Sequence, residues 1–135
     1  MKTIHRIIVF CIILILAFTG LAAAPLVGNP LVTGAWKGID LSDGSKIEVR
    51  ITNSYFVNYF DSASAYCSGG KVKGSGAGSL LGSSLVTSLR LKCTATNTIV
   101  AKNIALTFTY DSATGLLYDS NGNSYSKVKG AGCGR

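Results

Sequence analysis

Residues 104–128, IALTFTYDSATGLLYDSNGNSYSKV, decide the fold class. Apolar side chains occupy every second position over residues 104–110, which is the period of a strand with one buried face. Two tight turns, one closed by Gly115 and one by Gly122, separate this strand from two shorter ones. Three antiparallel strands joined in this way form a β-meander. The sequence therefore predicts an all-β domain.

The same alternation extends upstream of this meander. Residues 46–52 place Ile47, Val49 and Ile51 on one face and charged side chains on the other, as in a half-buried strand. Further strand-like stretches cover residues 34–40, 55–60, 71–78 and 85–93, with a weaker one at 98–101. The total is about eight antiparallel strands in sequential hairpins, with residues 94–103 mainly a connection. Such a chain hides its edges as a small barrel or a two-sheet sandwich.

Three glycines, Gly74, Gly76 and Gly78, share one face of the strand expected over residues 71–78. Glycine weakens a strand interior, so it marks a bend, a bulge or a close approach to the backbone. In a small closed sheet we favour the bend. The run over residues 74–79 lacks the spacing, the lysine motif and the helix of a phosphate-binding loop, so no phosphate site is predicted.

The N-terminus has the features of a secretory signal. Basic residues precede an unbroken apolar run over residues 7–18, and small side chains follow it. Gly20 and Ala22 occupy the two positions that a signal peptidase reads. We expect a signal helix that is removed by cleavage after Ala22.

An uncleaved anchor is the alternative, because the 21 residues from 7 to 27 reach the length of about 20 that a membrane span needs. In both cases the domain lies outside the cytoplasm. The expected organisation after the signal is a tether over residues 23–32, a β-domain over 33–129 and a flexible Gly/Cys tail over 130–135. Membrane contact is expected only through the N-terminal segment, if it stays attached.

Charge and composition narrow the partners. Without residues 1–22, 113 residues remain; eleven Lys or Arg and six acidic residues give a net charge of +5, and no histidine is left. This length fits one domain with its own core. The cations are scattered along the chain, so nucleic acid is not an expected partner, and a soluble basic surface is the simplest interpretation. Attraction to an anionic envelope polymer or membrane surface is the functional alternative.

The expected oxidation state of the cysteines depends on the compartment that the protein enters. Cys11 leaves with the signal, whereas Cys67, Cys93 and Cys133 enter an oxidising space where pairing is expected. A hairpin turning near Gly82 would bring Cys67 and Cys93 to its open end, within bridging reach. We therefore predict a Cys67–Cys93 disulfide. Cys133 is left as a thiol or as the link of a disulfide-bonded dimer.

No catalytic residue, cofactor or metal site is predicted. Without histidine the usual Ser-His and Cys-His activation is missing, and zinc loses its commonest ligands. Glu48 is the only glutamate and sits among alternating strand charges. Asp61, Asp111 and Asp119 each follow an aromatic residue and precede a serine, which we interpret as turn chemistry. A divalent-ion site would need many oxygens to converge on one point.

The strand expected over residues 55–60 has aromatic residues on both faces: Tyr55 and Tyr59 on one, Phe56 and Phe60 on the other. Both faces of a strand in a small sheet cannot be core. Either the tyrosines lie at the rim with their hydroxyls in water, or one face covers another surface.

The candidate binding residues are three tyrosines and two nearby lysines: Tyr55, Tyr59, Tyr66, Lys71 and Lys73. Tyrosine gives flat contact area with a polar tip, suited to stacking on sugars or gripping a protein. The lysines would favour an anionic polymer. Packing at the barrel rim is the simpler explanation for the tyrosines.

The opening Gly34-Ala35-Trp36 of the first strand resembles the start of lipocalin and streptavidin-like barrels. The resemblance implies that Trp36 is a structural plug at the barrel floor, and that a ligand cavity is lined by Phe56, Leu89 and Phe108. More broadly, the distribution of the tryptophan, the turns and Cys67 looks like that of uncharacterised modules exported by bacteria. That likeness suggests a location outside the cytoplasm and a fold, but no activity.

The function expected from the sequence is that of an exported, non-catalytic binding module at the cell envelope or outside the cell. Its partner would be an envelope polysaccharide or a protein. One alternative is a secreted hydrolase inhibitor that uses the loop over residues 61–70. The other is a carrier of a small apolar ligand.

Overall fold

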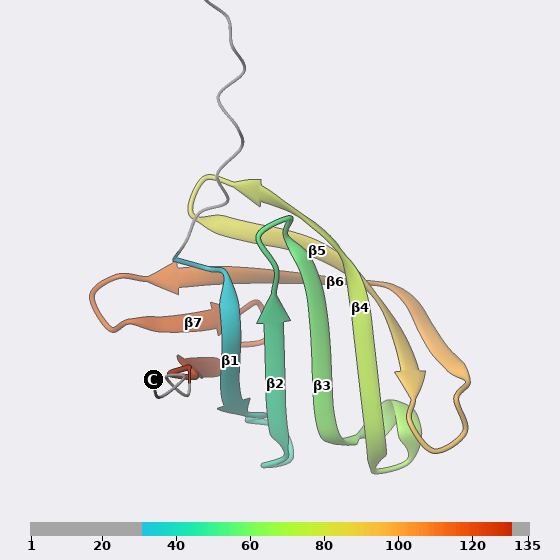
Figure 1. The fold of residues 1–135 in the computed structure, drawn as a ribbon. Coiled ribbons are helices and arrows are strands. Elements are labelled where there is room, and N and C mark those ends of the chain that lie inside the picture. The colour runs from blue at the N-terminus through green and yellow to red at the C-terminus, as the bar shows by residue number, and fades with distance from the viewer. Residues whose placement is uncertain (1–30, 131–135) are drawn as a thin grey trace, which may run out of the picture.

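Eight strands follow one another around a closed antiparallel barrel in the computed structural model, which describes residues 31–130 (Figure 1). They are β1 (Gly34–Ile39), β2 (Lys46–Ile51), β3 (Phe56–Ser64), β4 (Gly70–Leu81), β5 (Ser84–Cys93), β6 (Ile99–Asp111), β7 (Leu116–Asp119) and β8 (Ser124–Lys127). A single 3₁₀ turn, η1 (Ala65–Cys67), joins β3 to β4. Over this range the predicted all-β fold is confirmed.

Pairing of the first strand with the last decides between barrel and sandwich. Each strand pairs with its successor, and β1 also pairs with β8, with Trp36 opposite Lys127 and Gly38 opposite Tyr125. The sheet therefore closes on itself and leaves no pair of separate layers.

Several predictions fall outside the described residues. These are the signal helix over residues 1–22, the cleavage after Ala22, most of the tether over 23–32, and Cys133 with its tail. Within residues 31–130, no helix is long and apolar enough to span a membrane.

The barrel interior is filled by side chains. On β2, Ile47, Val49 and Ile51 point inward and the charged residues between them point outward, as the alternation predicts. They belong to one cluster of buried residues whose largest fully buried members are Trp36, Tyr125, Phe108, Ile47, Ile51, Leu85, Leu89, Leu117, Val32, Val49, Val57 and Val72. Their burial is the main source of stability for a closed sheet of this size.

Trp36 lies in this core. Its indole Nε1 donates a 3.0 Å hydrogen bond to the carbonyl oxygen of Val32, which ties the segment before β1 to the barrel. Its ring packs against Tyr110, with 6.0 Å between ring centroids, and the Lys127 ammonium lies 5.3 Å from the ring.

Three strands extend several residues beyond their predicted bounds, and one of them is β4, which reaches Leu81 rather than residue 78. β6 already begins at Ile99, so the connection expected over residues 94–103 is mostly strand; the register of β5 and β6 shifts near Leu91, and Asn103 has a φ of 58°. These irregularities break the alternation that identifies a strand. β3 likewise runs to Ser64, so part of the loop expected over residues 61–70 is sheet.

The glycine-rich strand β4 curves along the barrel, and its glycines lie on the inner side (Figure 1). A Cβ on Gly76 would lie 2.0 Å from the Ser88 carbonyl oxygen of β5, and one on Gly74 2.7 Å from Leu91. The curvature therefore brings β4 so close to β5 that side chains have no room.

The predicted Cys67–Cys93 disulfide is confirmed. It joins η1 to the end of β5, with 5.6 Å between the two Cα atoms. Such a bond fits an extracytoplasmic protein, because cytosolic thiols are kept reduced.

Candidate binding surface

The candidate tyrosines do not share one exposed face. Tyr55 and Tyr59 are half-buried and pack against the core from the inner side, whereas Tyr66 on η1 is 53% exposed. Burial, together with the charge of nearby Asp61, raises the pKa of the Tyr59 phenol. The outer side of β3 presents Phe56 and Phe60 instead, so of the two aromatic faces expected for this strand the tyrosine face is the one turned toward the core.

Strand register brings charged residues that are distant in sequence into one row across the outer surface. Starting on β1, paired positions run from strand to strand through β6. The first row is Lys37, Glu48, Phe60, Lys73, Lys92 and Ile99. Neighbours in such a row have Cβ atoms about 5 Å apart.

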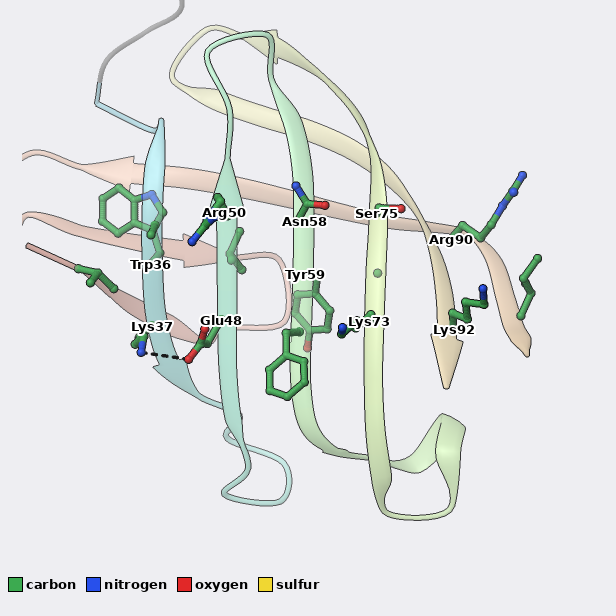
Figure 2. Close-up of a pocket in the computed structure, with 16 residues that line it drawn as sticks. Trp36, Lys37, Glu48, Arg50, Asn58, Tyr59, Lys73, Ser75, Arg90 and Lys92 are labelled. Carbon is green, nitrogen blue, oxygen red and sulfur yellow. Dashed lines mark ion pairs between the residues drawn. The ribbon is translucent and has the colours of Figure 1, made fainter. Parts of the chain in front are cut away.

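A second row lies two residues further along each strand. It consists of Ala35, Arg50, Asn58, Ser75 and Arg90. Figure 2 shows polar side chains of both rows, drawn from β1 to β5. We call these two rows the basic face.

The basic face lines a broad hollow on the outside of the barrel. The hollow has a volume of about 1030 Å³ and extends from β1 to β6 (Figure 2). Phe60 is half-buried in the middle of the first row, while most of the charged side chains are exposed. A polymer could therefore lie on this face without any strand moving.

The charge of the basic face is strongly unbalanced. Five cations face one carboxylate, and that carboxylate, Glu48, is already paired with Lys37, with 3.1 Å between Nζ and Oε1. Lys73 on β4 stands directly opposite Lys92 on β5. Two charges of the same sign that face each other across neighbouring strands destabilise a sheet, whereas two charges of different sign stabilise it. Within the two rows no second acidic residue compensates them.

Of the candidate residues, Lys73 belongs to the basic face, and Lys71 lies just outside its two rows. Lys73 lies in the first row, and Lys71 is the next exposed residue on the same side of β4. Sequence reasoning missed the other members, above all Arg50, Arg90 and Lys92. The alternation of β2 and β5 already placed these side chains outward; the missing information was the register that aligns the strands.

The buried carboxylates do not form a second site. Oδ1 of Asp61 accepts hydrogen bonds from the Ser45 hydroxyl at 2.7 Å and the Ala63 amide at 2.9 Å. Asp119 is bound within the turn between β7 and β8. At Asp111, a hydrogen bond from the Ala113 amide lowers the carboxyl pKa. No group of three metal-ligating residues occurs in residues 31–130; Asp111 and Asp119 bind within their own turns, and Asp61 holds the β1–β2 connection through Ser45.

The lining proposed for an internal cavity is also divided. Leu89 and Phe108 are buried in the packed core, whereas Phe56 lies on the outer surface and is 41% exposed. The eight-stranded barrel is compatible with the lipocalin-like resemblance of Gly34-Ala35-Trp36 but does not establish it. In comparisons with known proteins, no family model, no curated protein and no solved structure matches the chain.

Proposed function

We propose that the chain is an exported, non-catalytic module that binds an anionic polymer on its basic face. The observation that carries this proposal is the direct opposition of Lys73 and Lys92 in a face with a single, already paired carboxylate. Such a placement lowers the stability of the sheet. The two opposed lysines are favourable once a polyanion occupies the face, because the polyanion neutralises their repulsion.

A merely solvated basic surface would be built differently. Lysines scattered over a barrel keep it soluble, and cross-strand pairing with acids would cost nothing in solubility. Here four cations gather on one face between β2 and β5: Arg50, Lys73, Arg90 and Lys92. Their fields add over the hollow, so the attraction for a charged polymer exceeds that of isolated lysines.

Export and the absence of catalysis complete the proposal. The apolar N-terminal run supports a signal, and the Cys67–Cys93 bond fits an oxidising compartment. The side chains that fill the barrel favour binding on its outside over transport of a small ligand within it. The described carboxylates are engaged in turns or ion pairing, which favours a binding role over hydrolysis.

Inhibition of a hydrolase is a second candidate, supported by one observation. Tyr66 is 53% exposed and directly precedes Cys67, whose disulfide fixes η1 to β5. A fixed, exposed aromatic residue is typical of protein-binding hot spots. A substitution Tyr66→Ala that abolishes tight binding to a protein, while polyanion binding is absent, would favour this candidate.

The proposed function is tested by measuring the affinity of the oxidised protein for a polyanion and for neutral dextran. We expect binding to the polyanion only, with an affinity that falls as salt screens the charges. A Lys73→Gln, Lys92→Gln double variant should bind at least about tenfold more weakly. The matched control is Lys46→Gln, Lys129→Gln, which changes net charge equally outside both rows. Equal affinities of the two double variants would contradict the proposal.

A further inference from the structure

An aromatic ring sits among the charges of the basic face. Phe60 lies on the outer side of β3, half-buried, with Glu48 beside it on β2 and Lys73 beside it on β4. The core is on the opposite side of the sheet, so the barrel does not need a phenylalanine here. A flat apolar ring that is partly accessible beside hydrogen-bonding groups suits the apolar face of a sugar ring.

The polar neighbours of Phe60 can recognise hydroxyl groups. Glu48 accepts hydrogen bonds, Asn58 in the second row both donates and accepts them, and Ser75 adds a hydroxyl. A carboxylate in the face attracts hydroxyl donors and repels anionic oxygens, whether these belong to a carboxylate or to a phosphate. The polar neighbours of Phe60 therefore favour a polymer that carries hydroxyls as well as anionic groups over a chain of phosphates alone.

The cations continue from Phe60 along the same row. Lys73 and Lys92 lie one and two strands further on, about 5 and 10 Å away at the usual strand spacing. Arg90 lies in the adjoining row and offers the planar fork that binds carboxylates with two hydrogen bonds. Aromatic ring and cations thus follow one line across the strands.

We infer that the anionic polymer is an acidic polysaccharide that crosses the strands along the first row, with one sugar ring stacked on Phe60 and its carboxylates on Lys73 and Lys92. This inference rests on the proposed function, because it names the class of polymer that the basic face would bind. Its distinctive part is the aromatic contact, which charge alone does not require.

The test compares two anions of matched charge by titration calorimetry: an oligogalacturonate, which has sugar rings and carboxylates, and a polyphosphate, which has neither. Phe60→Leu should weaken oligogalacturonate binding roughly five- to tenfold, since it removes the stacking surface, and leave polyphosphate binding unchanged. Phe60→Tyr should keep the affinity of the original protein. Phe56→Leu is the matched control, because Phe56 lies on the same side of the same strand but outside both rows.

Each outcome has a defined meaning. The inference is overturned if Phe60→Leu, still folded by circular dichroism, leaves oligogalacturonate binding unchanged or weakens both anions equally, or if the original protein prefers polyphosphate. If Phe56→Leu weakens oligogalacturonate binding as much as Phe60→Leu does, the polysaccharide does not follow the first row across the strands. Failure of the proposed function looks different: neither anion would distinguish the original protein from the Lys73→Gln, Lys92→Gln variant.

Discussion

Tyr125 donates its hydroxyl to Oδ2 of Asp119 across 2.6 Å inside the barrel. The same oxygen accepts a hydrogen bond from the Asn123 side chain at 3.0 Å, while Oδ1 accepts from the amides of residues 121 and 123, both at 2.9 Å. The turn between β7 and β8 is thereby held to the core. Since Asp119 is buried, each of these bonds replaces a lost interaction with water.

Removal of this hydroxyl should destabilise the barrel. We expect Tyr125→Phe to lower the free energy of unfolding by about 1–3 kcal/mol, because a buried carboxylate loses a donor. Chemical denaturation measures the change. Tyr118→Phe is the control, because Tyr118 lies on neighbouring β7 and its hydroxyl makes no hydrogen bond to another residue of the range 31–130. Equal stability of the Tyr125 variant and the original protein would show that water replaces the bond.

The same contacts predict a loss of stability at alkaline pH. Burial, and then the hydrogen bond to Asp119, raise the pKa of the Tyr125 phenol, and burial also raises that of Tyr59. Below the unfolded pKa of about 10, both states are protonated and the full stability is present. Above that pH the phenol ionises more readily in the unfolded state, so the unfolded state is favoured and stability is lost. Unfolding free energy should therefore fall above pH 10, by at most about 1.4 kcal/mol per pH unit for each phenol.

Urea denaturation at about pH 9, 10 and 11 checks this dependence. A Tyr59→Phe, Tyr125→Phe double variant should show a shallower decline than the original protein, because neither phenol remains to ionise. A decline of the same steepness in the double variant would assign the loss to other groups.

The sequence identified the strands where one side chain in two is buried. β2 and the second half of β6 alternate cleanly, so their faces could be assigned without a structure. The first half of β6 could not, because the register shift near Leu91 and the left-handed Asn103 interrupt its period. Closure into a barrel depends on pairing between β1 and β8, which are about 90 residues apart, and no local pattern encodes such a contact.

The candidate site shows the same limit. Lys73 was found because tyrosines and lysines lie near it in sequence, whereas Arg50 and Lys92 join it only through strand pairing. The tyrosines were favoured for their chemistry, but Tyr59 alternates with Phe60, and the sequence alone does not tell which of the two faces the core. The packing of the closed barrel makes that choice.

The Cys67–Cys93 disulfide should contribute substantially to stability. It closes a loop with a sequence separation of 26 residues, which corresponds to roughly 3–4 kcal/mol in the chain-entropy account. We expect a Cys67→Ser, Cys93→Ser double variant to lose about this amount in urea denaturation. A reducing agent should destabilise the original protein but not the variant. Peptide mapping that links Cys133 to either partner would contradict the pairing in solution.

Gly76 tests the close approach of β4 and β5. A Cβ at this position would lie 2.0 Å from the Ser88 carbonyl oxygen, so Gly76→Ala must push two paired strands apart. We expect a loss of about 1–3 kcal/mol, as for other overpacked sites. Gly130→Ala is the control, because a Cβ there meets no atom of the described residues within 4 Å. If thermal unfolding shows equal midpoints for the two variants, β4 and β5 are further apart in solution.

The opposition of Lys73 and Lys92 leads to a prediction in which stability and binding change in opposite directions. Lys92→Glu replaces a like-charged pair by an opposite-charged one, which should raise the unfolding free energy by about 0.2–1 kcal/mol. The same change removes two units of positive charge from the basic face, so affinity for an anionic polymer should fall at least about tenfold. A residue that serves only the fold would not show this combination.

The measurements are urea denaturation and polyanion titration on the same preparation, with Lys46→Glu as the matched control. That substitution makes the same change in net charge outside both rows, so it should affect binding far less. A Lys92→Glu variant that is more stable yet binds equally well would show that the pair is not part of a binding surface. A less stable variant would show that Lys73 and Lys92 do not repel each other strongly in solution. Their placement would then not destabilise the sheet, and a bound polyanion would have no repulsion to neutralise.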